Sequence, residues 1–230
     1  MFTLEKPMTE QDLLAQLDAI VDEHHLLKHK FYQLWNEGKL TLTALQEYAK
    51  EYYHQVHFFP TYVSATHAAC DDLAVRQMLL ENLIEEERGA NHHPELWLRF
   101  AEGLGVDRDA VLNHEPAQDT KESVQTLKAL SRSENPAVGM AALYAYESQI
   151  PAVSTTKIAG LKDYYGIESE AALSFFQVHE QADAVHSQMT REAIAKLCKT
   201  PDDQAAAINA TETAVKALNQ LLDGVYAAHC

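Results

Sequence analysis

Three side chains in the segment 179–186 have the types and the spacing of metal ligands. His179, Asp183 and His186 stand at positions i, i+4 and i+7, so they share one face if the segment is helical. Apolar residues flank all three, which favours a face that points into the protein. The alternative is a polar helix face whose side chains form hydrogen bonds within the helix.

Three further candidate ligands lie upstream of this segment. Glu86 and His93 are seven residues apart, and Glu147 lies inside an apolar stretch with helical character. A buried carboxylate is costly unless a metal ion or a basic side chain neutralises it, so Glu147 needs a partner of one kind or the other. Glu86 is expected near the apolar edge of its helix, whereas Glu85 and Glu87 are expected to point away from it.

The six candidates form a ligand set of three carboxylates and three imidazoles without a thiolate. Such a set suits iron or manganese in a two-metal site better than a structural zinc, and it does not distinguish between the two metals. The leading hypothesis is therefore a redox metalloenzyme. The pair Glu51 and His54 matches one half of the ferritin-like Glu-x-x-His signature, but that signature requires two copies, so the pair is not counted among the ligands.

Helices are expected to position these side chains. Glycine and proline are scarce, with 8 and 7 residues, and apolar residues recur at spacings of three and four. We expect an all-α fold of seven or eight helices within one domain, residues 1–230. Followed along the chain, the pattern gives nine segments, one more than that count. They cover about 10–24, 26–37, a long helix capped by Thr41 or Thr43, a helix from Asp71-Asp72 to Gly89, and about 94–104, 119–132, 136–164, 168–198 and 202–228. Pro60 is expected to kink its helix and Pro151 to bend or interrupt the helix 136–164, while residues 105–116 read as a polar connection.

Charge and cysteine content restrict the class of protein. The formal net charge of −16 disfavours binding to nucleic acid or to an anionic membrane surface. The chain has no secretion signal at its start and no apolar run of about 18 residues, so a cytoplasmic location is expected. Three widely separated cysteines, Cys70, Cys198 and Cys230, indicate neither a disulfide framework nor a zinc knuckle.

Four segments resemble a known family. They are His29-Lys-Phe-Tyr32, Phe59-Pro-Thr-Tyr62-Val-Ser-Ala, Tyr144-Ala-Tyr-Glu147-Ser-Gln-Ile-Pro151 and His179-Glu-Gln-Ala-Asp183-Ala-Val-His186. The chain is similar, from about residue 10 to 225, to the chlamydial protein that associates with death domains and to its bacterial relatives. The resemblance implies a haem-oxygenase-like helical bundle, as in pyrroloquinoline-quinone synthase and thiaminase II, that binds two metal ions instead of haem.

The resemblance also implies a reaction and its residues. The family's ligands correspond to Glu86, His93, Glu147, His179, Asp183 and His186. The implied activity is the synthesis of p-aminobenzoate for folate, with dioxygen as oxidant and an external electron donor. The implied substrate is a tyrosine of the enzyme itself, which corresponds to Tyr32, and the implied amino donor is a lysine that corresponds to Lys157. From its residue type alone, Tyr32 is equally a core aromatic residue, and Lys157 is a solvated helix lysine unless burial lowers its pKa.

Two other functions are compatible with the sequence. The first is a di-metal oxidase that acts on an external small molecule in the same bundle. The second is a non-enzymatic protein-binding module, suggested by the death-domain association of the chlamydial relative. A homodimer is the default expectation for an enzyme of this kind.

Overall fold

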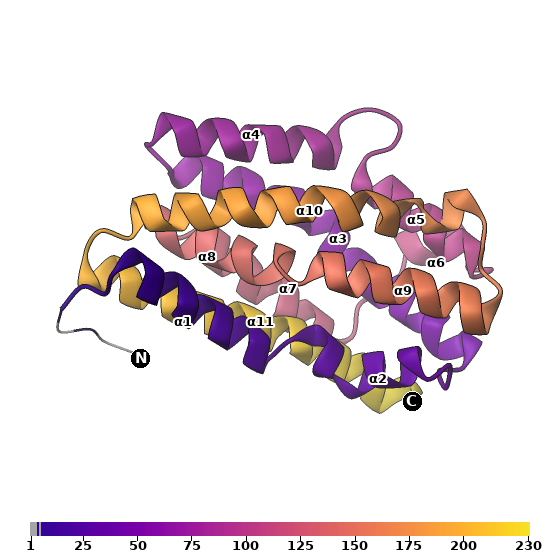
Figure 1. Cartoon of the computed structure of the whole chain (residues 1–230). Helices are drawn as coiled ribbons and strands as arrows, with labels where there is room; N and C mark the ends of the chain where they lie inside the picture. Colours follow the sequence, from indigo (N-terminus) through magenta and orange to yellow (C-terminus); the bar gives the residue numbers. More distant parts are fainter. Residues whose placement is uncertain (1–3, 5) are drawn as a thin grey trace.

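The chain folds into a bundle of helices in the computed structural model (Figure 1). The structure describes residue 4 and residues 6–230, and within α10 it describes the side chains except those of residues 181–185. In chain order the elements are α1 (Glu10–Glu23), the 3-10 helix η1 (Leu26–Lys28), α2 (Lys30–Asn36), α3 (Leu42–Ala69), α4 (Leu73–Glu87), α5 (His93–Gly103), α6 (Arg108–Leu112), α7 (Gln118–Ser131), α8 (Pro136–Glu147), α9 (Ile150–Tyr165), α10 (Glu170–Leu197) and α11 (Pro201–His229).

Many helix boundaries are where capping residues predict them. Thr41 accepts a hydrogen bond from the Ala44 amide at the start of α3, and Asp72 accepts one from the Val75 amide at the start of α4. The described part contains eleven α-helices, more than the seven or eight expected. One extra helix is α6, which lies in the segment expected to be a polar connection.

Two predicted helices are each divided into two. The segment 26–37 splits into η1 and α2, because His25 and His29 cap the two pieces with their Nδ1 atoms. The segment 136–164 is interrupted before Pro151, as predicted, and the break separates α8 from α9. Gln149, which lies at this break, donates a hydrogen bond from Nε2 to the carbonyl of Ala145 (2.7 Å). Pro60, in contrast, lies within the continuous helix α3.

The bundle is arranged around two of its long helices. Helix α3 contacts α4, α5, α7, α8 and α11, and α10 contacts α4, α5, α8 and α9. Figure 1 shows α10 crossing the molecule between α4 on one side and α8 and α9 on the other. A fully buried group of aromatic residues is contributed by α2, α3 and α5 and includes Trp35, Trp97, Tyr32, Tyr48, Phe31 and Phe100.

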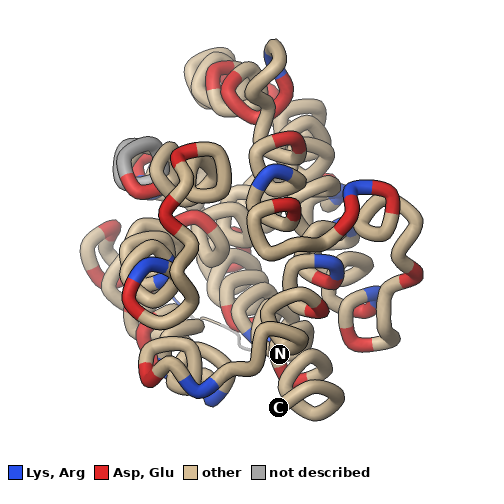
Figure 2. The backbone as a smooth tube through the Cα atoms, turned by 90° about the vertical axis from the view of Figure 1, so that its right-hand side faces the viewer, with Lys and Arg blue, Asp and Glu red and all other residues tan. Residues whose placement is uncertain are grey.

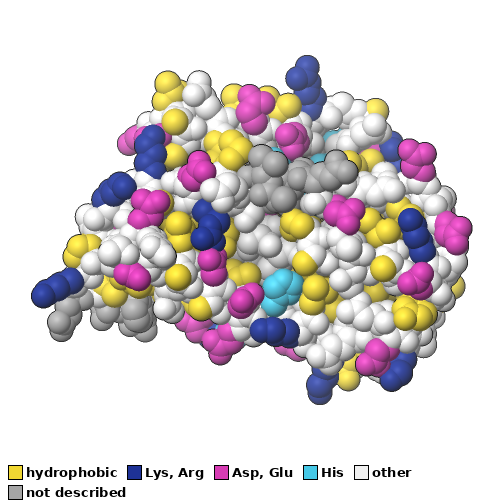
Figure 3. Space-filling model, viewed as in Figure 1, with side chains coloured by type: hydrophobic (Ala, Val, Ile, Leu, Met, Phe, Trp, Pro, Cys, Tyr) yellow, Lys and Arg dark blue, Asp and Glu magenta, His cyan; other side chains and the backbone are white. Residues whose placement is uncertain are grey.

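Charged residues lie mainly on the outside of this bundle. Seen along the helices in Figure 2, acidic positions outnumber basic ones and are spread over several elements. The space-filling view in Figure 3 likewise shows acidic side chains scattered over one face without a dominant basic patch. No helix in the described part of the chain is long and apolar enough to cross a membrane.

Candidate metal centre

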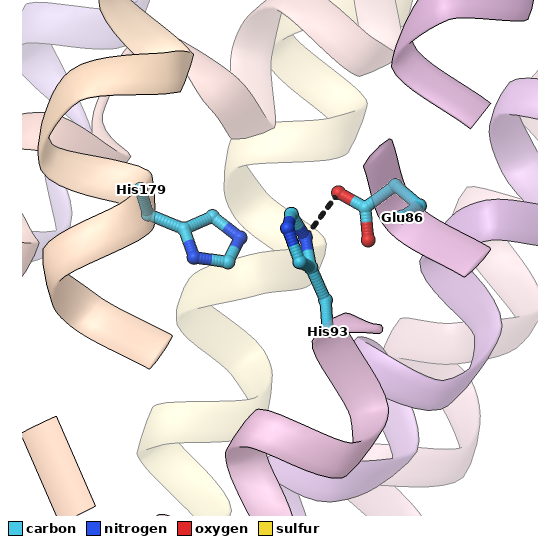
Figure 4. A group of neighbouring side chains, drawn as sticks. All are labelled: Glu86, His93 and His179. Carbon is cyan, nitrogen blue, oxygen red and sulfur yellow. Dashed lines mark ion pairs between the residues drawn. The ribbon is translucent and has the colours of Figure 1, made fainter. Parts of the chain in front are cut away.

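Three of the predicted ligands converge in the interior. Glu86 at the end of α4, His93 at the start of α5 and His179 on α10 each offer a ligand atom, and these atoms lie within 4.8 Å of one another. All three side chains are buried. The Oε1 atom of Glu86 lies 2.8 Å from Nδ1 of His93, and the rings of His93 and His179 have centroids 4.3 Å apart (Figure 4).

The connection between α4 and α5 brings Glu86 and His93 together. Helix α4 ends at Glu87, and Gly89 adopts a positive φ of 80°, a conformation that side chains rarely tolerate. His92 then caps α5 by accepting a hydrogen bond from the Glu95 amide, so His93 is the first residue of the helix. The sequence places His93 at this helix junction because it precedes a proline.

A backbone carbonyl sets the tautomer of His179. Its Nδ1 atom lies 2.6 Å from the carbonyl oxygen of Phe175, which can only accept, so Nδ1 carries the proton and Nε2 carries the lone pair. Burial lowers the pKa of His179 well below its usual value, and the neighbouring His93 lowers it further. His179 is therefore held neutral, which is the form that binds metal ions.

Glu147 and His186 extend the site toward α8 and the second half of α10. Glu147 is the last residue of α8 and is 2% exposed. Its Oε1 atom accepts a hydrogen bond from Nδ2 of Asn82 (2.7 Å) and lies 3.7 Å from Nδ1 of His186. Glu147 also lines the cavity that Glu86, His93 and His179 line. Asp183, the sixth predicted ligand, belongs to the part of α10 whose side chains lie outside the described ones.

Two residues of α4 that the sequence did not single out contact this site. Asn82 is 5% exposed and holds Glu147. Glu85 was expected to point away from the apolar edge, and its side chain is exposed, but its Oε2 also lies 3.1 Å from Nε2 of His186. A signal for both is present in the sequence: residues 82, 85 and 86 fall on one face of a helix.

Lys157 and Tyr32 lie in a buried group of aromatic residues beside the cavity. Lys157 is 2% exposed, and its Nζ donates a hydrogen bond to the hydroxyl of Tyr48 (2.7 Å), which is 2.9 Å from the hydroxyl of Tyr32. Five ring centroids lie 5.0–5.4 Å from Nζ, those of Tyr32, Tyr48, Tyr52, Trp97 and Phe176. Burial lowers the pKa of Lys157 well below its usual value, so this residue is not the solvated helix lysine of the alternative interpretation.

The Glu-x-x-His pair on α3 has a different role. The carboxylate of Glu51 is 2.8 Å from Nε2 of His114 and accepts hydrogen bonds from the amide of Ala117. It thereby attaches the segment before α7 to α3. Glu51 and His54 do not belong to the convergent ligand group found among the described residues.

The residues at the cavity fit a divalent metal of intermediate hardness. Two buried acidic side chains, Glu86 and Glu147, offer oxygen atoms, and His179 offers an imidazole nitrogen. Oxygen and imidazole ligands of this kind suit iron and manganese. Interior carboxylates are also stabilised when a cation binds between them.

Comparisons with known proteins agree with this chemistry. Residues 46–219 match the family model described as iron-containing redox enzyme. The chain is 46% identical over 181 residues to the 4-aminobenzoate synthase of Chlamydia pneumoniae, which covers 79% of this chain and 80% of the relative. It is 39% identical to the 4-aminobenzoate synthase of Nitrosomonas europaea, with 97% and 94% covered.

A solved structure identifies the fold. A domain of unknown function with a haem-oxygenase-like fold from Shewanella denitrificans superimposes with a TM-score of 0.71 at 22% identity, covering 95% of this chain and 90% of that one. The expected all-α, haem-oxygenase-like fold is therefore confirmed.

Proposed function

We propose that this chain, which belongs to the family of iron-containing redox enzymes, forms 4-aminobenzoate. Its relatives in Chlamydia pneumoniae and Nitrosomonas europaea are named 4-aminobenzoate synthase, and they align with most of its length. The proposed cofactor is a pair of iron or manganese ions held by Glu86, His93, Glu147, His179, Asp183 and His186. When bound, these ions would supply the electron transfer that activates dioxygen.

We further propose that the enzyme makes the product from its own Tyr32, with Lys157 as the amino donor. The observation that carries this proposal is the position of Lys157. Its side chain lines the cavity that contains the candidate ligands, while its Nζ lies 5.4 Å from the ring centroid of Tyr32. The proposed reaction therefore has a nitrogen at the cavity and a phenol ring within 5.4 Å of that nitrogen.

The covalent changes follow from the chemical structures of tyrosine and 4-aminobenzoate. Tyrosine and 4-aminobenzoate share a para-substituted benzene ring. Conversion requires cleavage of the Cα–Cβ bond of Tyr32 and oxidation of Cβ to a carboxylate, with dioxygen as the oxidant. The Nζ atom of Lys157 replaces the phenol oxygen, which leaves as water, and the Nζ–Cε bond of Lys157 is broken so that the amino group departs with the product. Dioxygen and an electron donor serve as co-substrates.

The protein's own residues prepare the nitrogen and the ring for this exchange. Burial lowers the pKa of Lys157, which favours the neutral amine, and the lone pair of a neutral amine can act as a nucleophile. The Tyr48 hydroxyl accepts a hydrogen bond from Nζ of Lys157 and pairs with the Tyr32 hydroxyl, so it fixes the position of the amine relative to the phenol ring. All three side chains are at most 2% exposed, which keeps water away from reactive species.

The size of the cavity favours an internal substrate over an external one. Its volume is about 20 Å³, room for a molecule the size of water. A benzene ring needs a cavity of about 150 Å³. An aromatic substrate from solution would therefore require the helices around the cavity to move apart.

A single-turnover assay tests the proposal. Metal-free protein is supplied with iron, or with iron and manganese, together with a reductant and dioxygen, and the released 4-aminobenzoate is measured. We expect at most about one equivalent per chain, and protein labelled with ring-¹³C tyrosine should release labelled product. Tyr32→Phe should release none while its metal content is unchanged.

Tyr62→Phe is the matched control, because Tyr62 is also buried and donates its hydroxyl hydrogen to Gln55 (2.9 Å). It should retain product formation. Sustained turnover of an added substrate, with Tyr32 intact by mass spectrometry, would show instead that the enzyme is an oxidase of an external molecule.

A further inference from the structure

One face of α4 contacts candidate ligands that come from three other helices. Asn82, Glu85 and Glu86 stand at positions i, i+3 and i+4, so their side chains lie on the same face. Asn82 contacts Glu147 of α8, Glu85 contacts His186 of α10, and Glu86 contacts His93 of α5. Of the three, only Glu86 is itself a candidate ligand, so the face does more than supply a metal-binding carboxylate.

The two ring nitrogens of His186 have different surroundings. Its Nδ1 faces the site, 3.7 Å from Oε1 of Glu147. Its Nε2 faces outward and lies 3.1 Å from Oε2 of Glu85. Only one nitrogen of an imidazole can bind a given metal ion, and the other then carries a proton that needs an acceptor.

A carboxylate at the outer nitrogen is a recurring feature of metal-binding histidines. It fixes the orientation of the ring, selects the tautomer and makes the inner nitrogen a stronger ligand. The Glu85 side chain is 51% exposed, whereas that of His186 is 11% exposed, so the carboxylate closes the solvent side of the imidazole. Glu85 and His93 also line one surface groove, which places Glu85 at the outer edge of the metal centre.

We propose that Glu85 is a positioning residue for the metal centre, which orients His186 so that Nδ1 faces the metal ion. This inference rests on the metal site of the proposed function. The Asn82 side chain makes a similar contact with Glu147, where Nδ2 donates to Oε1. Helix α4 therefore supplies one ligand and orients two others.

Metal binding by the full chain tests the role of Glu85 without an activity measurement. Metal-free protein is titrated with Mn²⁺, and the unbound ion is followed by its electron paramagnetic resonance signal. The variants are Glu85→Ala, Glu85→Gln and, as a matched control, Glu87→Ala. Glu87 is exposed on the same helix, and its removal changes the net charge by the same amount as the removal of Glu85.

We expect Glu85→Ala to weaken the binding of one Mn²⁺ ion about 10- to 100-fold, the range found when such an outer partner is removed. Glu85→Gln should recover most of the affinity, because its amide oxygen can still accept the hydrogen bond from Nε2. Glu87→Ala should bind Mn²⁺ within about twofold of the wild type, as expected for a surface substitution.

Three results overturn the inference about Glu85. They are an unchanged affinity in Glu85→Ala, an equal loss in Glu87→Ala, and a glutamine variant as weak as the alanine variant. A wild-type protein that binds no Mn²⁺ overturns the metal site and this inference together. Normal Mn²⁺ binding with the expected order of variants, but no 4-aminobenzoate, contradicts the proposed function alone.

Discussion

Replacing Lys157 by methionine is expected to stabilise the protein while removing the proposed amino donor. The Lys157 side chain is 2% exposed, and its Nζ is surrounded by five aromatic rings. No carboxylate among the described residues forms an ion pair with it. Methionine retains an unbranched apolar chain of similar length and lacks the amine, so it suits this environment better than lysine.

The size of the effect follows from the hydrogen bonds of the amine. In the described structure Nζ donates one hydrogen bond, to the Tyr48 hydroxyl, and that hydroxyl remains paired with Tyr32 when Lys157 is replaced. The lost hydrogen bond is worth about 1 kcal/mol, whereas each buried donor without a partner costs about 1–3 kcal/mol. A neutral amine has two N–H groups, so within the described part of the chain one buried donor stays unpaired, and its removal gives a net gain of about 0–2 kcal/mol. Such a gain raises the Tm of a protein of this length by up to roughly 8 °C.

The gain should depend on pH in a definite direction. Burial lowers the pKa of Lys157 in the folded protein from the ordinary value of 10.5. Between the lowered pKa and 10.5, the unfolded chain binds a proton that the folded protein does not. Wild-type stability therefore rises with pH in this window, by at most about 1.4 kcal/mol per pH unit, and the advantage of Lys157→Met shrinks.

Thermal unfolding of metal-free protein at about pH 7, 8 and 9 measures both the gain in stability and its dependence on pH. Lys162→Met is the control, because Lys162 is exposed on the same helix and its replacement should change stability by no more than about 0.5 kcal/mol. A lower Tm for Lys157→Met at pH 7 would refute the reasoning, since it would mean that the amine is stabilised in the folded state. A difference between variant and wild type that does not change with pH would show that Lys157 is not held neutral by burial.

Three other predictions concern the scaffold and the site. Gly160→Ala should destabilise the protein by about 1–3 kcal/mol in denaturant unfolding, because a Cβ atom at this position would lie 2.5 Å from the indole of Trp35. A variant as stable as the wild type would show that α2 and α9 can move apart at no cost in free energy. Gln149→Leu should lower the Tm, because it removes the hydrogen-bond acceptor of the Leu26 amide and the donor to the Ala145 carbonyl, and each buried group left unpaired costs about 1–3 kcal/mol. An unchanged Tm would contradict a role for Gln149 at the break between α8 and α9. The stability of metal-free protein should fall as the pH drops below 6.5, the ordinary pKa of histidine, because burial lowers the pKa of His179 and only the unfolded chain takes up the proton. In urea titrations at about pH 7 and 5.5, the stability of His179→Leu should depend less on pH than that of the wild type, and an equal pH dependence would argue against this assignment.

Much of the fold could be predicted because its determinants are local. Capping by Thr41 and Asp72 and the interruption before Pro151 depend on residues within a few positions of each boundary. The division of the segment 26–37 was missed because histidine is an uncommon capping residue. Helix α6 was missed because its five residues are too few for a periodic pattern.

The sequence by itself determined which side chains have metal-binding chemistry and which helix face each occupies, because residue type and helical spacing are properties of the chain. Only the tertiary structure decided that Glu86, His93 and His179 meet, since their distances depend on how α4, α5 and α10 pack. The same holds for the contact of Glu85 with His186 and for the burial of Lys157. A side chain's partners and its pKa depend on the helices that cover it, and helix packing sums many weak contacts between distant parts of the chain, which no local pattern records.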